Sequence, residues 1–218
     1  MVTIESDFLY PCRTSHLFDK DWLIRWQGEL QYTFKRGEQI SYPNKLENDL
    51  FLVVMGNVSI GHIHEDGKEC VLGILGAGDF IDLPSAFSNK VSKVYATALT
   101  NVEVVKVPKK DIVDKVIGTP ELSHQLLSYF SNQLQEVVQI LEQVAYDKVE
   151  ERLIRAFHRL MDPTNERNGW YPLPPYITHK DIAGMIASTR ETVTFLINKL
   201  IQSGVLKNEE NRLWVIKD

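Results

Sequence analysis

The sequence of 218 residues contains little cysteine: its two thiols, Cys12 and Cys70, can form at most one disulfide. A disulfide-stapled secreted domain is therefore excluded. The chain also lacks an apolar run approaching the roughly 20 residues that span a bilayer. Its first 20 residues lack the basic-then-apolar order of a signal peptide. These absences predict a cytoplasmic protein without a membrane partner.

Positive charge is scarce in the chain as a whole, whose formal net charge is −5. The deficit is confined to one region, because residues 1–149 carry 14 Lys and Arg against 20 Asp and Glu. Residues 150–218 carry 10 against 9. The C-terminal third can therefore contact nucleic acid even though the average charge argues against it.

The first half of the chain has the pattern of a small all-β unit. Short apolar runs alternate with glycines, at residues 50–55, 58–63, 70–75 and 102–107. Asp66-Gly67 lies between two of these runs and predicts a two-residue hairpin turn, because both central positions of that turn take positive φ. Many short strands at this spacing predict a small antiparallel sandwich or barrel that can enclose a pocket.

After Pro120 the apolar period changes to that of a helix. Apolar side chains follow a 3-4-3-4-3 spacing at Leu127, Phe130, Leu134, Val137, Leu141 and Val144. This spacing gives one narrow apolar stripe, which predicts a long helix that dimerises along it. Packing of the stripe on the chain's own barrel is the alternative. A further helix is expected over residues 149–161, followed by a loop over residues 163–175.

Near the C-terminus the sequence predicts two short helices joined by a tight break. Thr178 can cap a helix over residues 179–186, and a second helix begins near Arg190 after the break at 187–189. The apolar positions of the second helix define its buried face: Val193, Leu196, Ile197 and Leu200. Arg190 and Glu191 are left at its exposed N-terminal end. This arrangement predicts a helix-turn-helix, whose second helix enters the major groove of DNA.

Two strand-like runs around the polar turn at residues 208–211 predict a β-hairpin wing after these helices. A helical hairpin used only for packing is the alternative. The cap, the tight break, the exposed Arg-Glu pair and the wing occur together, and this combination favours DNA binding.

At this point the sequence resembles the CRP/FNR (cAMP receptor protein) superfamily of bacterial transcription regulators. The resemblance rests on the segments Gly56-Asn57-Val58, Asp66-Gly67-Lys68-Glu69, Gly76-Ala77-Gly78-Asp79-Phe80, Ala96-Thr97-Ala98, Val102-Glu103-Val104 and Ser188-Thr189-Arg190-Glu191-Thr192-Val193. It spans about residues 30–216, and the order of barrel, long helix and winged helix-turn-helix is specific to this family.

The resemblance implies an α+β fold in three parts. Residues 1–118 would form a jelly-roll antiparallel β-barrel of the cyclic-nucleotide-binding type, residues 119–148 the long dimerisation helix, and residues 149–218 the winged helix-turn-helix. It further implies a homodimer that binds a pseudo-palindromic promoter site and contacts RNA polymerase. Most of the family activates transcription, so an activator is expected, with an effector sensed in the barrel. An enzyme is not expected.

Base reading is expected from the start of the second helix. Arg190 would contact guanine and Glu191 would contact the N4 amino group of cytosine. Other polar residues would contact phosphates or position the helix: Thr178, Ser188, Thr189, Thr194 and Lys199. Phe195 stands where the closest family members have a third base-reading arginine, and we expect its ring to touch a thymine methyl group. The alternative is that Phe195 folds back onto the wing near Trp214.

The chain departs from the family members that bind cAMP. Those members have a Glu after the Gly-Asp-Phe strand and an Arg-Ser pair before the Ala-x-Ala strand, where this chain has Leu83, Ser92 and Lys93. Val137 and Val138 replace polar adenine contacts. A cyclic phosphate needs a positive partner and hydrogen-bond donors, so cAMP is not expected to bind. Two cysteines cannot supply the four thiolates of an iron–sulfur cluster, and no cofactor is predicted.

An effector pocket is still expected inside the barrel. Its effector is an unknown small molecule, or the protein acts without an effector. The expected lining of the pocket is Ile60, His62, Val71, Leu83, Tyr95, Leu134, Val137 and Val138. We also expect Trp22 and Trp26 to pack an N-terminal helix on the barrel, Cys70 to be buried and inert in a strand, and Lys109-Lys110 to form a solvated turn. Cys12 is the better candidate for oxidation.

The histidines of the barrel allow a competing interpretation. Gly56, His62, His64, Glu69 and Gly76 have the spacing of the first metal-binding motif of the cupins. Across a tight turn at 66–67, Glu69 would lie opposite His64, and the three side chains could converge on one metal ion. The alternative function is therefore a cupin-like metal sensor or metalloenzyme. The second cupin motif is not visible, which favours no metal at this place.

Overall fold

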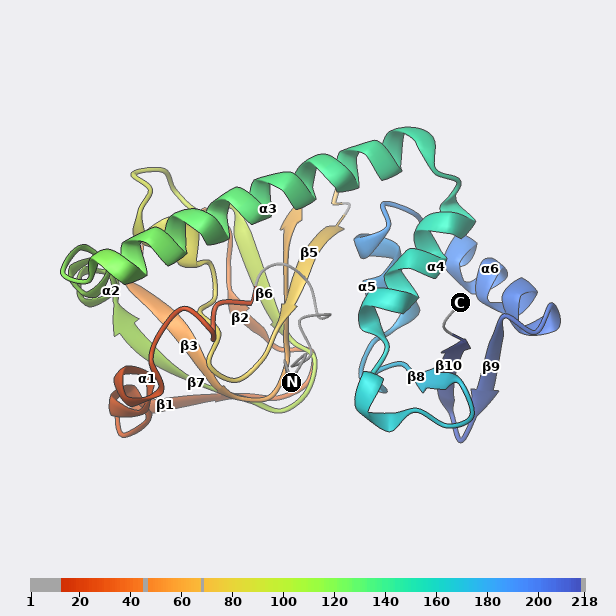
Figure 1. Ribbon diagram of the computed structural model, residues 1–218, viewed down its shortest axis with the longest axis horizontal. Helices are drawn as coiled ribbons and strands as arrows, with labels where there is room; N and C mark the ends of the chain where they lie inside the picture. Colours follow the sequence, from red (N-terminus) through yellow and green to blue (C-terminus); the bar gives the residue numbers. More distant parts are fainter. Residues whose placement is uncertain (1–12, 45–46, 68, 217–218) are drawn as a thin grey trace. The chain divides into compact units, whose positions relative to one another are not determined.

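The computed structural model describes residues 13–44, 47–67 and 69–216, and it divides at Val137/Val138 into two compact units (Figure 1). The helices are α1 (Lys20–Gln27), η1 (Leu83–Ala86), α2 (Lys109–Ile117), α3 (Pro120–Tyr146), α4 (Val149–Leu160), η2 (Pro163–Asn165), α5 (His179–Met185) and α6 (Arg190–Gln202). The strands are β1 (Gln31–Phe34), β2 (Gln39–Ser41), β3 (Asp49–Met55), β4 (Val58–Ile63), β5 (Glu69–Leu75), β6 (Val94–Ala98), β7 (Val102–Pro108), β8 (Trp170–Pro172), β9 (Leu206–Glu209) and β10 (Arg212–Ile216). None of the described helices has the length and apolarity needed to cross a membrane. The division between the units falls inside α3, the helix predicted as a separate part.

The first unit, which we call the sheet unit, contains two antiparallel sheets with strand orders β1-β7-β3 and β2-β6-β4-β5. The predicted α+β class and the antiparallel strands are confirmed. Within the described ranges the ladders form two separate sheets. Strand β3 is also joined to the loop after β5, by a bridge between Leu52 and Phe80 and by backbone hydrogen bonds of Val53 and Phe51 to residues 78, 79 and 81. The inward faces of the two sheets share one apolar core, which includes Val53, Val58 and Ala96.

The outer face of the β1-β7-β3 sheet is also apolar. Strand β7 alternates between the two cores, with Val104 in the core between the sheets and Val105 and Val107 in the outer core. Helices α1, α2 and the start of α3 cover this outer face. Trp22 and Trp26 of α1 are buried there, as predicted.

A buried carboxylate connects the segment before α1 to the loop after β5. Asp79 has no exposed surface, and one of its oxygens accepts hydrogen bonds from the backbone N–H groups of Thr14 (2.7 Å) and Ser15 (2.8 Å). The other accepts from the Gly76 N–H at 2.8 Å and pairs with the Arg13 guanidinium. Charge-assisted bonds of this kind offset the desolvation of a buried carboxylate.

The hairpin between β4 and β5 differs from the prediction. The register pairs Ile63 with Glu69 and His62 with Cys70, so five residues, and not two, connect the strands. A bulge between Ile60 and Gly61 shifts the register by one position. Because strand side chains alternate between faces, this one-residue shift puts Glu69 and His62 on opposite faces of the sheet.

Helix α3 has two apolar faces. Leu122, Leu126 and Tyr129 are buried in the outer core of the sheet unit. The predicted stripe lies on another face and is mostly exposed, with Leu127 68% and Leu134 66% accessible. The solvated turn predicted at Lys109-Lys110 is wrong, because these residues begin α2, which buries Ile112 and Val116.

The second unit, which we call the reading unit, contains α4, α5, α6 and a three-stranded sheet of order β8-β10-β9. Its helices bury Phe157 and Leu153 of α4 against the rest of the unit. The predicted wing is present as β9 and β10. Strand β8 lies in the segment predicted as a loop, where it pairs Tyr171 with Val215 of β10. The distant strand β10 therefore orders a segment with no strand pattern of its own.

Candidate functional site

The break between α5 and α6 is built on one left-handed residue. Ala187 has φ 50°, and the next N–H, that of Ser188, bonds back to the Ala183 carbonyl at 3.0 Å. An alanine in this region costs roughly 1–2 kcal/mol relative to a right-handed conformation. The break therefore ends α5 abruptly, and α6 starts after four residues, 186–189.

Both helices of the pair have side-chain caps. The Thr178 hydroxyl donates to Asp181 Oδ2 at 2.6 Å, and the Thr178 N–H donates to the same oxygen at 2.8 Å. Thr189 caps α6 by accepting from the Thr192 N–H at 3.2 Å. Such caps satisfy N–H groups that the first turn of a helix leaves without partners. Thr178 and Thr189 were predicted either to contact phosphates or to position the helix. The contacts described here fit the positioning role.

The faces of α6 are divided as the sequence predicts. The stripe Val193, Leu196, Ile197 and Leu200 is buried. Arg190, Glu191 and Phe195 are exposed, and the Phe195 ring keeps 68% of its surface accessible. Arg190 and Glu191 stand in the first turn, where side chains of a reading helix meet base edges. The helix therefore presents a cation, an anion and an apolar ring from one face.

Thr194 and Lys199, predicted to contact phosphates or position the helix, have protein partners in this structure. The Thr194 hydroxyl donates to the Arg190 carbonyl at 2.9 Å and lies 2.9 Å from Nδ1 of His179. The ammonium group of Lys199 pairs with Glu150 of α4 at 2.5 Å. These bonds join α6 to α5 and to α4. Ser188 is half-buried beside the break.

His179 was not singled out by the sequence analysis, although it joins the two helices through Thr194. Burial lowers the pKa of its ring below the ordinary value of 6.5, and the nearby charge of Arg190 lowers it further. The ring is therefore neutral at pH 7. A neutral ring avoids placing a second cation beside Arg190. His179 is the first residue of α5, where polar surface residues are common, so the sequence pattern did not distinguish it from them.

The wing holds a group of stacked cations and indoles. The guanidinium of Arg167 lies 5.1 Å and the ammonium of Lys207 lies 5.2 Å from the centre of the Trp214 ring. Lys207 also lies 4.9 Å from the Trp170 ring. Trp214 is only 2% exposed. Cation–π contacts of this kind stiffen the wing beneath its turn.

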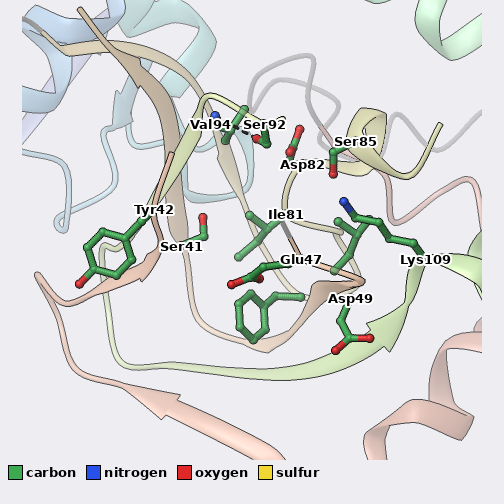
Figure 2. Close-up of a pocket in the computed structure, with 12 residues that line it drawn as sticks. Ser41, Tyr42, Glu47, Asp49, Ile81, Asp82, Ser85, Ser92, Val94 and Lys109 are labelled. Carbon is green, nitrogen blue, oxygen red and sulfur yellow. Dashed lines mark hydrogen bonds between the residues drawn. The ribbon is translucent and has the colours of Figure 1, made fainter. Parts of the chain in front are cut away.

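The sheet unit contains a cavity, drawn in Figure 2, between the segment after β2, the start of β3 and η1. Asp82 lies beside Ser85 and Ser92 there, and Lys109 faces it from the start of α2. Burial raises the pKa of the Asp82 carboxyl, and hydrogen bonds from Ser92 and Ser85 oppose that rise. Glu47 and Asp49 also line the cavity, so its charged groups are three carboxylates and one ammonium.

The eight residues predicted for the effector pocket do not line this cavity. Ile60, Val71, Leu83 and Tyr95 are buried in the sheet unit. His62 is exposed, and so are the α3 residues of the set, Leu134, Val137 and Val138. Their role in binding an effector stays a prediction.

The alternative in which His62, His64 and Glu69 converge on one metal ion is not supported by the structure. Glu69 pairs with Ile63 and not with His64, which lies in the connecting loop. Nδ1 of His64 instead accepts from the Asp66 N–H at 3.2 Å. Within the described residues no group of His, Cys, Asp or Glu side chains could hold a metal ion. The register shift at the bulge is the reason, because it separates the three side chains.

The burial predicted for Cys70 is also wrong. Cys70 lies in β5, as predicted, but its side chain is exposed because it lies on the outward face of the sheet, where it pairs with the exposed His62, whereas the next residue, Val71, is buried. The surrounding atoms still raise the pKa of its thiol by partial desolvation. Thiols with a raised pKa hold less of the reactive thiolate at neutral pH. Cys12 lies outside the described residues.

Comparison with known proteins identifies both units. A family model described as "Cyclic nucleotide-binding domain" matches residues 31–116, and one described as "Crp-like helix-turn-helix domain" matches residues 151–218. The chain is 25% identical over 174 residues to the cyclic AMP receptor protein of Thermus thermophilus, covering 80% of this chain and 78% of that protein. It is 27% identical over 190 residues to the global nitrogen regulator of Synechococcus elongatus, covering 84% and 83%.

Solved structures agree with these relatives. A CRP/FNR-family transcriptional regulator from Thermus thermophilus superposes with a TM-score of 0.66 at 25% identity, over 86% of this chain and 94% of that one. The c-di-GMP-responsive global regulator CLP of Xanthomonas campestris superposes with a TM-score of 0.73 at 18% identity, over 91% and 100%, and this likeness concerns the fold. Together with the capped helix pair and the two antiparallel sheets, these matches show that the chain belongs to the CRP/FNR family of transcription regulators.

Proposed function

We propose that the protein is a homodimeric, sequence-specific DNA-binding regulator that activates transcription and whose sheet unit responds to an effector other than cAMP. The observation that carries the proposal is the exposed face of α6. Arg190 and Glu191 stand in its first turn, and the residues around them are engaged in holding the helix in place. A preorganised helix N-terminus with two side chains of opposite charge suits the direct readout of bases.

Arg190 is proposed to donate two hydrogen bonds to the O6 and N7 atoms of guanine. Glu191 is proposed to accept one from the N4 amino group of the paired or neighbouring cytosine. Thr178, Ser188 and Thr189 would position the helix and supply contacts to phosphate oxygens. The ion pair of Lys199 with Glu150 competes with a phosphate contact, so the contribution of Lys199 to DNA affinity is expected to be smaller than that of Arg190.

Dimerisation is proposed along the stripe of α3. Five stripe residues are 45% or more exposed: Leu127, Leu134, Val137, Leu141 and Val144. A soluble helix gains nothing from exposing such a stripe, whereas a second copy of the helix would bury it in a two-stranded coiled coil. The buried face at Leu122, Leu126 and Tyr129 leaves this stripe available. A two-fold dimer would present two reading units to a pseudo-palindromic site.

The effector of this regulator is proposed to be a small molecule without a cyclic phosphate. Leu83 is buried and apolar where cAMP-binding members carry a Glu, and Val137 and Val138 offer no hydrogen bonds. Activation through contact with RNA polymerase is proposed from the family resemblance alone. The proteins named above include a cyclic AMP receptor protein and a c-di-GMP-responsive regulator, so the small molecules in their names differ.

Selection of binding sites from randomised duplex DNA by the full-length protein tests the proposal. We expect a pseudo-palindromic motif whose half-site holds a G·C pair. Arg190→Ala should cost about 1–3 kcal/mol of DNA affinity and relax one position of the motif. Arg25→Ala, which removes an exposed arginine from α1 of the other unit, is the matched control. Recovery of no motif, or identical behaviour of the two variants, would contradict the proposal.

A further inference from the structure

The reading unit contains a cavity that is separate from the exposed face of α6. Its volume is about 230 Å³, and α4, α5, α6 and the wing all contribute to its wall. A cavity of about 150 Å³ in another protein accommodates a benzene molecule. The space is therefore sufficient for a molecule with one aromatic ring or a short aliphatic chain.

The floor and the rim of this cavity differ in polarity. Leu160, Ile182 and Ile197 form an apolar floor, and each is at most 2% exposed. The rim is polar and comes from the exposed asparagines of α6, β9 and the wing turn: Asn198, Asn208 and Asn211. An apolar floor with a few polar groups at one end is typical of sites that orient an amphipathic small molecule.

The positive charge at the rim of the cavity favours a ligand whose polar group is negatively charged. Arg212 is the charged residue of the lining at neutral pH, because the described residues around the cavity include no Asp or Glu and the His179 ring is neutral. The Nε–H of Arg212 donates to the Leu173 carbonyl at 2.7 Å, which holds the guanidinium at the rim. That bond uses one of five N–H donors, and a guanidinium binds carboxylates through paired donors.

Asp162 also interacts with the charge of Arg212. Burial raises the pKa of the Asp162 carboxyl, hydrogen bonds from Thr164 and Asn165 lower it by more, and the Arg212 charge lowers it further. The oxygens of Asp162 already accept from the Thr164 N–H at 2.9 Å, the Thr164 hydroxyl at 2.6 Å and the Asn165 amide at 2.7 Å. Asp162 does not line the cavity. Within the described lining, no carboxylate therefore opposes the charge of Arg212.

We infer that this cavity is a binding site for a small monocarboxylate with an apolar body, seated with its carboxylate on Arg212 and its body on the floor. The inference concerns the reading unit itself and does not depend on DNA binding. It places a ligand site beside α6, in addition to any effector site in the sheet unit.

Methyl NMR of the full-length protein tests the inference, because Ile177, Ile182, Ile197 and Ile201 line the cavity. With isoleucine δ1-methyl labelling, titration with phenylacetate at constant ionic strength should shift these four signals saturably. The methyl signals of Ile74 and Ile112, buried in the sheet unit, should not move. At equal concentration 2-phenylethylamine should bind at least about tenfold more weakly than phenylacetate, with 2-phenylethanol between them.

Two kinds of variant test the charge of Arg212 and the volume of the cavity separately. Arg212→Gln should abolish the preference for phenylacetate over 2-phenylethanol, and Arg212→Lys should keep it. If Arg212→Gln does not fold, Ile201→Phe provides the second variant, and it should weaken both ligands because the added ring fills the cavity. Absence of saturable shifts up to about 10 mM phenylacetate, equal affinity for the amine, or unchanged selectivity in Arg212→Gln would overturn the inference.

Discussion

Leu134 is the stripe residue whose truncation gives the sharpest measure of dimerisation. It stands in the middle of the stripe and is 66% exposed in one chain. Full burial of a leucine side chain is worth about 1.5–3 kcal/mol relative to full exposure. Burial of the exposed two thirds would therefore contribute about 1–2 kcal/mol from each protomer, and Leu134→Ala removes most of it.

In a two-fold dimer the substitution acts twice, so the loss is about 2–4 kcal/mol for each dimer. The dimer dissociation constant should rise about 30- to 1,000-fold, since 1.4 kcal/mol is a factor of ten. Sedimentation equilibrium over a concentration series measures this constant. Leu30→Ala is the matched control, because Leu30 is 72% exposed and lies outside α3. Equal dissociation constants for the two variants would refute the stripe as the interface.

Three further predictions concern the reading face, its pH dependence and the effector. Phe195→Ala should change the half-site selected from randomised DNA at one A·T-containing position, because the ring that touches a thymine methyl is lost; an unchanged selection would exclude this contact. His179 has a lowered pKa in the folded state, so the folded chain binds fewer protons than the unfolded chain and stability should fall as the pH drops through and below 6.5. Urea unfolding at about pH 5.5 and about pH 7.5 should show a smaller pH effect in His179→Gln, and an equal effect would contradict the assignment. Calorimetry with cAMP should detect no binding. Micromolar affinity would show that other side chains replace the glutamate that cAMP-binding members have at the position of Leu83.

Helical periodicity allowed the buried face of α6 to be predicted from the sequence. Val193, Leu196, Ile197 and Leu200 were expected on the buried face and are buried, because the spacing of apolar residues along a helix reports directly which face is covered. The position of α2 shows the limit of local interpretation. Lys109 and Lys110 suggest a solvated turn when taken alone, but the spacing of Ile112 and Val116 was the signal for a helix.

Strand register was not predictable in the same way. The bulge at Ile60-Gly61 sits where β4 pairs with β5 on one side and with β6 on the other. Which face of a strand turns outward, and where a ladder slips by one residue, depends on partners far away in the sequence. The exposure of Cys70 and the separation of His62 from Glu69 both follow from such partners. The cavity in the reading unit is likewise formed by four elements that only the tertiary structure brings together.

The alanine in the break between α5 and α6 has a consequence for the stiffness of that joint. Glycine would adopt the φ of 50° at Ala187 without steric cost, but it would also lose more backbone entropy on folding. The steric cost of alanine at this φ, roughly 1–2 kcal/mol, exceeds the roughly 0.4–1 kcal/mol of unfolded-state entropy that alanine saves relative to glycine. Alanine also restricts the motion of the native backbone, because its Cβ leaves only a small left-handed region open. The break is therefore narrow in its allowed backbone geometry, which keeps the angle between α5 and α6 nearly fixed.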